Sequence, residues 1–419
     1  MKTLICNRTI LVLKDIVSIR SASLNLGTGC EMLIRRIDPP VADPSTATSR
    51  SLSIWAVLEG RIGDDKQVLA LASALRGAVR IIQLGDTIPQ VIAGRLLDVI
   101  GIDTPWHKRK YSDREFPDLM IAAGGRSVTL ARWIKRASHG RTKVVFLGRP
   151  WARMGDLDLV VTTPQYALPR VSNVQMNLLP LNHIEASRLE EMGACWAPKF
   201  AHLPRPWIGV LVGGNSGSFR MTPDCAKRLG GQLSRLAQET GGSVLLTTSA
   251  RTPAACAELL ASSLTCPSYT HLWQPGQAAN PYLGILALAD RFLVTGETAS
   301  MIAEAANTGK ALELFDLQER PLSRLLTKFV PALGLGWVFR LGARRGYWTP
   351  PRNMDRLHRA LEVRGYLGEA DSPTRGRLRR PIEWDLARTV ARISHLYAPE
   401  PVVAAQPTTP SGPLANQIA

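Results

Sequence analysis

Residues 53–75 read SIWAVLEGRIGDDKQVLALASAL, and this stretch contains the unit from which the fold follows. Its apolar run, Ser53–Leu58, lacks strict polar alternation, which is typical of a strand that is buried on both faces. After the turn EGRIG, the segment Asp64–Leu75 carries apolar residues at helical spacing, namely Val68, Leu69, Leu71, Ala72 and Leu75. A buried strand that leads through a glycine turn into such a helix predicts an α/β domain with a parallel sheet.

The first half of the chain continues this alternation of apolar strands and helices. A helix is predicted at Ser127–Ala137, and further strands are predicted at Val79–Leu84, Asp118–Ala123, Thr142–Leu147 and Asp158–Thr163. Because these strands are apolar throughout, the sheet should be covered by helices on both faces. We therefore predict a first Rossmann-like lobe over residues 51–175.

The second half of the chain repeats the plan. Strands are predicted at Trp207–Val212, Ser243–Thr247, Arg291–Thr295 and Ala311–Phe315, and helices at Pro223–Glu239, Pro253–Leu264, Pro281–Ala289 and Ser300–Ala306. This pattern predicts a second Rossmann-like lobe, which binds nucleotide, over residues 207–330. Residues 176–206 show weak periodicity and are interpreted as the interlobe connection. The predicted fold class is α/β, with two Rossmann-like lobes facing a cleft.

The two ends of the chain are expected to differ from the lobes. We predict a partly disordered N-terminal extension over residues 1–50 and a disordered segment, rich in Pro, Thr and Ala, over residues 401–419. Residues 331–400 form a basic tail. Within it, Ile382–Tyr397 carries apolar residues at helical spacing, and we expect this helix to pack back on the first lobe.

Charge and composition limit the classes of function. The chain has 419 residues and a formal net charge of +17, and residues 340–392 contain 13 Arg, no Lys and 6 acidic residues. Such an excess is most simply a solvated surface, although it can also attract anionic lipid or phosphorylated ligands. No RNA-module signature accompanies it, so we predict no nucleic-acid partner. No apolar run approaches the about 18 residues of a membrane span, and we expect a cytoplasmic protein that can be peripheral to a membrane. The six cysteines have no paired spacing and imply neither zinc nor disulfides.

The turn after the first strand is the first candidate site. It packs Glu59, two glycines, one arginine, two acids, Lys66 and Gln67 into nine residues. A carboxylate here can act as a general base, and we assign Asp64 and Asp65 as catalytic candidates. The other candidates form an acceptor loop of Gly60, Arg61, Gly63 and Gln67. The alternative is structural, because Asp64 is also a good helix N-cap.

Three further segments form the candidate donor site in the second lobe. The strand ending at Thr295 runs into small polar residues that open a helix, an arrangement whose free N–H groups suit a diphosphate. A carboxylate one turn further along could bond ribose hydroxyls. The candidate donor-binding residues are Gly213, Gly214, Arg251, Gly296, Glu297, Thr298, Ser300 and Glu304. Capping is again the alternative for the Ser and Thr residues.

A family resemblance runs through these segments. The stretches SIWAVLEGRIGDDKQVLALASAL, PDLMIAAGGRSVTLARWIKR, GRTKVVFLGRP, DLVVTTPQYALP, LPRPWIGVLVGG, LLTTSARTP and NPYLGILALADRFLVTGETASMIAEA together resemble the mitochondrial fission Elm family and its bacterial relatives. The resemblance covers residues 53 to about 317 in matching order. It implies a GT-B-like glycosyltransferase fold. It also implies a possible protein partner, since the plant member of the family recruits a dynamin-related GTPase at the mitochondrial outer surface.

A second resemblance concerns the donor site alone. The stretch ALADRFLVTGETASMIAEAANTGKALELF is similar to the donor-binding region of the glycosyltransferase that adds N-acetylglucosamine in peptidoglycan synthesis. The similarity implies that Ser300 lies at the diphosphate and Glu304 at the ribose. That enzyme has a His beside its acceptor in the glycine loop, whereas this chain has Asp64 and Asp65.

Three hypotheses follow, and a basic nucleic-acid or membrane-surface binder ranks last of them. The first is a metal-independent glycosyltransferase without a cofactor, which takes a nucleotide diphosphate sugar, of the uridine diphosphate type, as donor and an unidentified acceptor. Asp64 or Asp65 would deprotonate the acceptor, and the Glu304 carboxylate would face a solvent-filled cleft. The second is a catalytically silent GT-B-like scaffold that recruits a protein partner. The first hypothesis requires the acidic loop and the loop at residues 298–304 to face each other.

Overall fold

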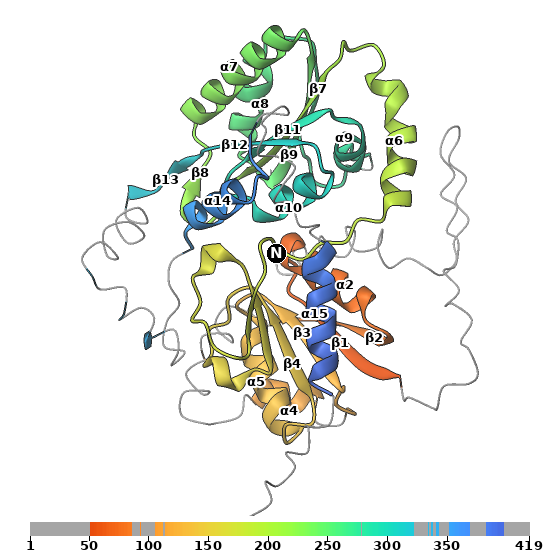
Figure 1. The fold of residues 1–419 in the computed structure, drawn as a ribbon, viewed down its shortest axis with the longest axis vertical. Coiled ribbons are helices and arrows are strands. Elements are labelled where there is room, and N and C mark those ends of the chain that lie inside the picture. Colours follow the sequence, from red (N-terminus) through yellow and green to blue (C-terminus); the bar gives the residue numbers. More distant parts are fainter. Residues whose placement is uncertain are drawn as a thin grey trace, which may run out of the picture.

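The computed structural model describes residues 51–85, 93, 105–111, 114–277, 279–321, 334, 337, 341–342, 352–368 and 383–397. The predicted N-terminal extension and the predicted disordered segment at residues 401–419 lie outside the described residues. The predicted basic tail is described only in part. The chain folds into two sheets with their helices, one above the other in Figure 1.

The first sheet has six parallel strands in the order β2-β1-β3-β4-β5-β6. Their bounds are β1 (Leu52–Leu58), β2 (Gly77–Gln83), β3 (Leu119–Ala123), β4 (Lys143–Leu147), β5 (Leu159–Thr162) and β6 (Val174–Met176). Helix α2 (Ile62–Ala74) packs on one face, and α4 (Pro105–Tyr111) and α5 (Ser127–Ala137) pack on the other. The core between this sheet and α2 contains Ile54 and Leu71, and the core between the sheet and the other two helices contains Trp55 and Trp133. The apolar strands are therefore buried from both sides.

The second sheet has five parallel strands in the order β10-β9-β7-β11-β12. Their bounds are β7 (Trp207–Gly214), β9 (Ser243–Arg251), β10 (Ser268–His271), β11 (Arg291–Thr295) and β12 (Ala311–Phe315). Helices α7 (Pro223–Thr240) and α8 (Ala254–Ser262) cover one face, and α9 (Tyr282–Leu288) and α10 (Ala299–Asn307) cover the other. A short antiparallel pair, β8 (Phe219–Arg220) and β13 (Gln318–Glu319), lies beside this sheet. The predicted α/β class with two Rossmann-like lobes is confirmed.

In each sheet the strand order reverses beside the first strand of the lobe. The reversal lies between β1 and β3 in the first sheet and between β7 and β11 in the second. Loops at the carboxyl ends of the strands diverge at such a switch point, which is where open α/β sheets bind ligands.

The segment predicted as an interlobe connection contains a helix that the sequence pattern missed. Helix α6 (Ala186–Phe200) packs against α9, and it buries Trp196 and Phe200 in the core of the second lobe. The approach is close because Gly284 of α9 lacks a side chain, whose Cβ would lie 2.5 Å from the Trp196 ring. An internal Pro198 weakens the local helical signal, so tertiary packing decides this element.

Two helices of the C-terminal part contact different lobes. Helix α14 (Met354–Val363) places Met354 and Leu357 in the core of the second lobe. Just before it, the Asn353 N–H donates to the Gln165 carbonyl of the first lobe (2.9 Å). Helix α15 (Glu383–His395) packs against α2, on the first lobe (Figure 1). The domain boundaries themselves stay a prediction.

Membrane-spanning helices are absent from the part of the chain that the structure describes, since none of its helices combines the length and apolar character that a bilayer requires.

Candidate functional site

The loop between β1 and α2 is held by one of the two predicted catalytic acids. The Asp65 carboxylate accepts the N–H groups of Glu59 and Gly60, each at 2.9 Å, and it is buried. Gly60 turns the chain with φ +80°, in the left-handed region that favours glycine. Both oxygens of Asp65 are thus occupied by the loop that it fixes.

Asp64 lies in the same helical turn but has a different environment. Helix α2 begins at Ile62 with Arg61 as its N-cap, so Asp64 is not the cap that the structural alternative required. Its carboxylate accepts no hydrogen bond from any residue that the structure describes. Burial raises the pKa of Asp64, and the charges of Arg61, Arg352 and Arg251 partly oppose this shift. Asp64 is therefore a half-buried acid with a raised pKa beside three cations.

Within the acceptor loop, Gly63 meets the second lobe. A Cβ on Gly63 would lie 2.9 Å from Ser300 Oγ, so the first turns of α2 and α10 meet here. The Gln67 amide donates to the Gly63 carbonyl within its own helix (3.2 Å). The structure thus brings the two predicted loops face to face.

In the predicted glycine turn of the second lobe, Gly213-Gly214, both N–H groups already have hydrogen-bond acceptors. The Gly213 N–H donates to Thr295 Oγ1 (2.8 Å), and the Gly214 N–H donates to Glu297 Oε1 (2.7 Å). These N–H groups serve packing at the switch point and are not free to bind a phosphate.

Glu297 crosses the switch point of the second sheet from the end of β11. Its side chain is buried, and Oε2 has no hydrogen-bond partner among the described residues. Burial raises the pKa of Glu297, and the N–H groups that it binds and Arg251 oppose the shift. Gly213 is required here, because a Cβ on it would overlap Glu297 Oε1.

The N-terminus of α10 has free donors. Thr298 precedes the helix without capping it by its side chain, and the N–H groups of Ala299, Ser300 and Met301 have no hydrogen-bond partner among the described residues. Arg251, at the end of β9, donates to Thr298 Oγ1 (3.2 Å). The helix dipole and a guanidinium group therefore add positive charge at one point. Gly296 supports this turn, since its carbonyl oxygen lies 2.7 Å from His358 Nε2 of α14.

Glu304 corrects one expectation. Its carboxylate does not face a solvent-filled cleft, because the residue is only 3% exposed. Oε1 forms an ion pair with Lys66 Nζ of the first lobe (2.7 Å), and Oε2 accepts the Tyr282 hydroxyl. Burial, followed by the charge of Glu304, raises the pKa of Tyr282 well above its usual range. The predicted ribose ligand is thus the centre of an interlobe contact.

Two arginines of this interface were not predicted. Arg352 donates to the Glu297 carbonyl (2.8 Å) and to Ser216 Oγ (3.3 Å), while its buried Nε–H has no partner among the described residues. Arg149, after β4, lies over the Tyr166 ring at 5.6 Å. No sequence signal separates Arg352 from the other arginines of the tail, whereas Arg149 follows a predicted strand in the segment GRP.

Family comparison agrees with the resemblance found in the sequence. A family model described as mitochondrial fission ELM1 matches residues 62–365. The chain belongs to this family.

Two curated relatives of this ELM1-family chain align over long segments. Mitochondrial fission protein ELM1 of Arabidopsis thaliana is 29% identical over 224 residues, which are 48% of this chain and 52% of the plant protein. The aligned segment therefore spans about half the length of that relative. The uncharacterized protein RP120 of Rickettsia prowazekii is 24% identical over 300 residues, 63% of this chain and 83% of the relative.

Solved structures similar to this ELM1-family chain include a glycosyltransferase from Rickettsia africae and a UDP-GlcNAc 2-epimerase from Methanocaldococcus jannaschii. The first has a TM-score of 0.43 at 11% identity and covers 83% of this chain and 99% of its own. The second has a TM-score of 0.42 at 11% identity and covers 82% of this chain and 99% of its own.

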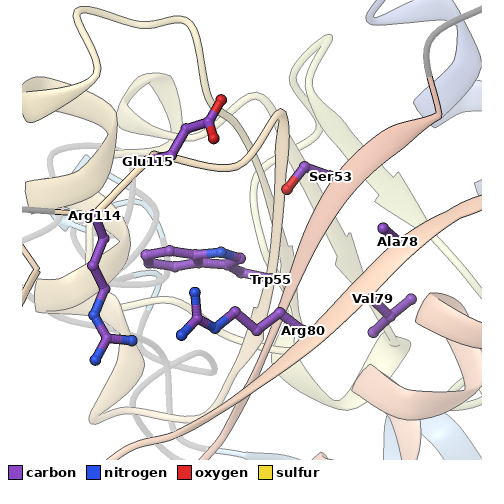
Figure 2. A pocket seen from close by; sticks show the side chains of 7 residues that line it. All are labelled: Ser53, Trp55, Ala78, Val79, Arg80, Arg114 and Glu115. Atoms are coloured by element: carbon purple, nitrogen blue, oxygen red, sulfur yellow. The ribbon is translucent and has the colours of Figure 1, made fainter.

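A hollow elsewhere on the first lobe belongs to no predicted site. It has a volume of about 440 Å³ and is open to solvent, and Figure 2 shows Trp55, Arg80 and Arg114 around it. Its lining comes from the first halves of β1 and β2 and from the segment before β3, opposite to the carboxyl ends where the candidate loops lie. None of the predicted site residues of this ELM1-family chain lines it.

Proposed function

We propose that this protein is a metal-independent glycosyltransferase that uses a nucleotide diphosphate sugar as donor. The observation that carries the proposal is the meeting of the α2 and α10 N-termini, at Gly63 and Ser300, between the carboxyl ends of two parallel sheets. Among the described residues, this meeting point combines Asp64, whose carboxylate accepts no hydrogen bond, with cations and with N–H groups that have no partner. A transferase needs these groups in one place, whereas a protein-binding scaffold does not.

The donor diphosphate binds at the N-terminus of α10. The free N–H groups of Ala299 and Ser300 and the Thr298 hydroxyl can donate to its oxygens, and Arg251 supplies a charge-assisted contact. These positive groups stabilise the leaving diphosphate without a metal ion. Trp273 follows the carboxyl end of β10, as the α10 N-terminus follows that of β11, and its partly exposed indole can stack on the nucleobase.

Asp64 acts as the general base. It removes the proton of the acceptor hydroxyl while the hydroxyl oxygen attacks the anomeric carbon and the bond from that carbon to the diphosphate breaks. Its raised pKa brings the carboxyl closer to neutral pH, where a general base works best. Asp65 keeps the loop in position instead, because both of its oxygens hold the backbone.

Glu304 contacts the ribose once its ion pair with Lys66 opens. Because this carboxylate is buried and fully paired, nucleotide binding requires the two lobes to separate locally at α2 and α10. Lys66 is partly exposed and can then move into solvent.

The test is isothermal titration of the full chain with the diphosphates of uridine, adenosine, guanosine and cytidine. We expect one of them to bind and Arg251→Gln to weaken it, while Arg359→Gln, an exposed arginine of α14, leaves it unchanged. Failure of all four to bind would reject the transferase and favour the scaffold.

A further inference from the structure

We infer that the hollow between the first halves of β1 and β2 (Figure 2) is a second ligand site, which binds a phosphate monoester between the guanidinium groups of Arg80 and Arg114. This end of the first sheet is opposite to the carboxyl ends of the strands, where the candidate loops lie. The inference is independent of the proposed glycosyltransferase activity, because it uses none of the residues of the interlobe site.

Three neighbouring segments bring the lining of the hollow together. Trp55 of β1 and Arg80 of β2 are opposite each other in the parallel register, so their side chains lie on the same face of the sheet. Arg114 comes from the segment before β3, and its guanidinium lies over the Tyr111 ring at 5.7 Å. The Lys110 ammonium lies over the same ring at 5.3 Å, and this ring packs against the Trp55 ring with centroids 5.8 Å apart. Both arginines are therefore placed around one indole, as Figure 2 shows.

The lining is rich in hydrogen-bond donors that have no partner. Among the described residues, neither Arg80 nor Arg114 has a carboxylate or a carbonyl oxygen bound to its guanidinium group. The Trp55 side chain is only 2% exposed, yet its indole N–H has no hydrogen-bond acceptor in the part of the chain that the structure describes. A tryptophan buried to this extent usually has an acceptor for its N–H. The Ser53 hydroxyl is a further donor in the same lining. These groups together require a ligand that supplies several acceptor oxygens.

The charge around the hollow favours a dianion. The lining contains Arg80 and Arg114 against one acidic residue, Glu115, and the neighbouring lysine adds a third positive charge. Asp118 does not belong to the lining, and its carboxylate already accepts the Ser53 N–H (2.8 Å). The three cations therefore exceed the charge of the one acid, and this excess stabilises a ligand with two negative charges.

The shape and chemistry of the hollow favour a phosphate monoester over a carboxylate. The terminal oxygens of a phosphate can accept from two guanidinium groups and still leave acceptors for other donors. The volume of about 440 Å³ lies within the range of about 300–1,000 Å³ that is usual for small-molecule sites. It leaves room for the alcohol part of the ester along Ala78 and Val79. Because the hollow is open to solvent, this part can belong to a soluble metabolite or to a lipid whose chains stay outside.

The first measurement is isothermal titration of the full chain at low ionic strength, with glycerol 3-phosphate as the probe and glycerol as its neutral counterpart. We expect glycerol 3-phosphate to bind and glycerol not to bind. Arg80→Gln and Arg114→Gln should each weaken binding by about 10- to 100-fold, as expected for loss of a charge-assisted bond. The matched control is Arg76→Gln, an exposed arginine directly before β2 that does not line the hollow, and it should bind like the wild type. Arg251→Gln, at the interlobe site, should also bind like the wild type. Thermal unfolding of each variant shows that it is folded.

A second arm identifies the source of the phosphate. It uses sedimentation with vesicles of phosphatidylcholine containing phosphatidic acid, against vesicles of phosphatidylcholine alone. Binding to phosphatidic acid that is lost in Arg80→Gln and Arg114→Gln but kept in Arg76→Gln supports the site with a lipid phosphate, whereas binding of glycerol 3-phosphate alone supports it with a soluble ester.

Three results would overturn the inference. The first is failure of both phosphate probes to bind. The second is equal weakening by Arg76→Gln and by the two variants of the hollow, which would show a general effect of surface charge. The third is loss of binding in Arg251→Gln with none in the variants of the hollow, which would place the phosphate at the N-terminus of α10.

Discussion

Both switch points contain a buried glutamate, but only one of these glutamates occupies the N-terminus of a neighbouring helix. In each lobe a buried glutamate at a strand end crosses from one side of the strand-order reversal to the other: Glu59 from β1, and Glu297 from β11. Glu59 Oε1 accepts the N–H groups of Arg126 and Ser127, both at 2.6 Å, and so occupies the N-terminus of α5. Glu297 instead accepts the Gly214 N–H of β7, and no described residue occupies the N–H groups at the N-terminus of α10.

The difference assigns separate roles to the lobes. A helix N-terminus that already holds a carboxylate cannot bind an anionic ligand, whereas one with free N–H groups can. The switch point of the first lobe is therefore closed by its own glutamate. Under the proposed function, the first lobe contributes Asp64 from the neighbouring loop, and the second lobe keeps the anion site for the donor. The predictions below test this division.

Removal of the base should have the largest effect. Asp64→Asn keeps the size and polarity of the side chain but cannot accept a proton, so transfer should fall by about 10²- to 10⁴-fold. Nucleotide affinity should stay nearly intact, because the base acts on the acceptor. Steady-state kinetics and titration with nucleotide measure the two quantities. The matched control is Asp224→Asn, in the exposed first turn of α7, which should leave both unchanged. Unimpaired transfer by Asp64→Asn would remove the catalytic role of the first lobe.

Glycines next to the two glutamates should be equally intolerant of a side chain. A Cβ on Gly124 would overlap Glu59 Oε2, and one on Gly213 would overlap Glu297 Oε1. We expect Gly124→Ala and Gly213→Ala each to destabilise the fold by about 1–3 kcal/mol, the usual cost of overpacking. Gly124 also has φ +85°, which adds strain.

Urea unfolding measures these glycine effects. Gly231→Ala in α7 is the control, because a Cβ there meets nothing within 4 Å and alanine favours a helix by up to about 1 kcal/mol. If both switch-point variants unfold like the wild type, the glutamates do not fix the switch points.

Glu304 joins the two lobes, so its substitution should affect ligand binding more than folding. Glu304→Gln should weaken nucleotide binding by about 1–3 kcal/mol through loss of a charge-assisted bond to ribose. Lys66→Met, which removes the competing cation, should strengthen binding instead. Titration of both variants with the nucleotide that binds the wild type distinguishes these opposite signs. A decrease of affinity in both would show that the ion pair supports the bound state.

The sequence predicted the fold because its strands and helices follow local periodicity. Strand β1 and helix α2, for example, agree with the predicted Ser53–Leu58 and Asp64–Leu75 within two residues at each end. Helix α6 was missed because its apolar residues are organised by α9 and not by a local pattern. Strand β10 was missed because it is a short, partly exposed edge strand.

The candidate site divides in the same way. Asp64 and Ser300 were predicted because each follows a strand at the start of a helix, and such positions meet at the carboxyl ends of a parallel sheet. The use of Asp65 as a loop anchor and the pairing of Glu304 with Lys66 depend on partners that no local pattern reveals. Arg352 was missed for the same reason, because it lies 55 residues after Glu297, whose carbonyl it binds.

The smallest predicted effect is on the pH dependence of folding stability, to which the two glutamates should contribute by different amounts. Burial raises the pKa of both Glu59 and Glu297 above the ordinary 4.5, so the folded state binds a proton at higher pH than the unfolded chain. Stability from each group is therefore fully present below pH 4.5 and is lost as the pH rises through its raised pKa, with a slope of at most about 1.4 kcal/mol per pH unit. Glutamine at either position carries no titrating proton, so Glu59→Gln and Glu297→Gln should each flatten the profile.

Urea unfolding between pH 4.5 and 8 measures the slopes, and the exposed Glu258→Gln of α8 should keep the slope of the wild type. The flattening should be greater for Glu297, because the charges of Arg126 and Arg61 both stabilise the charged form of Glu59, whereas Arg251 is the arginine that does so for Glu297. Equal slopes in the wild type and both glutamine variants would mean that neither carboxyl titrates differently on folding, and that the two switch points do not differ in charge.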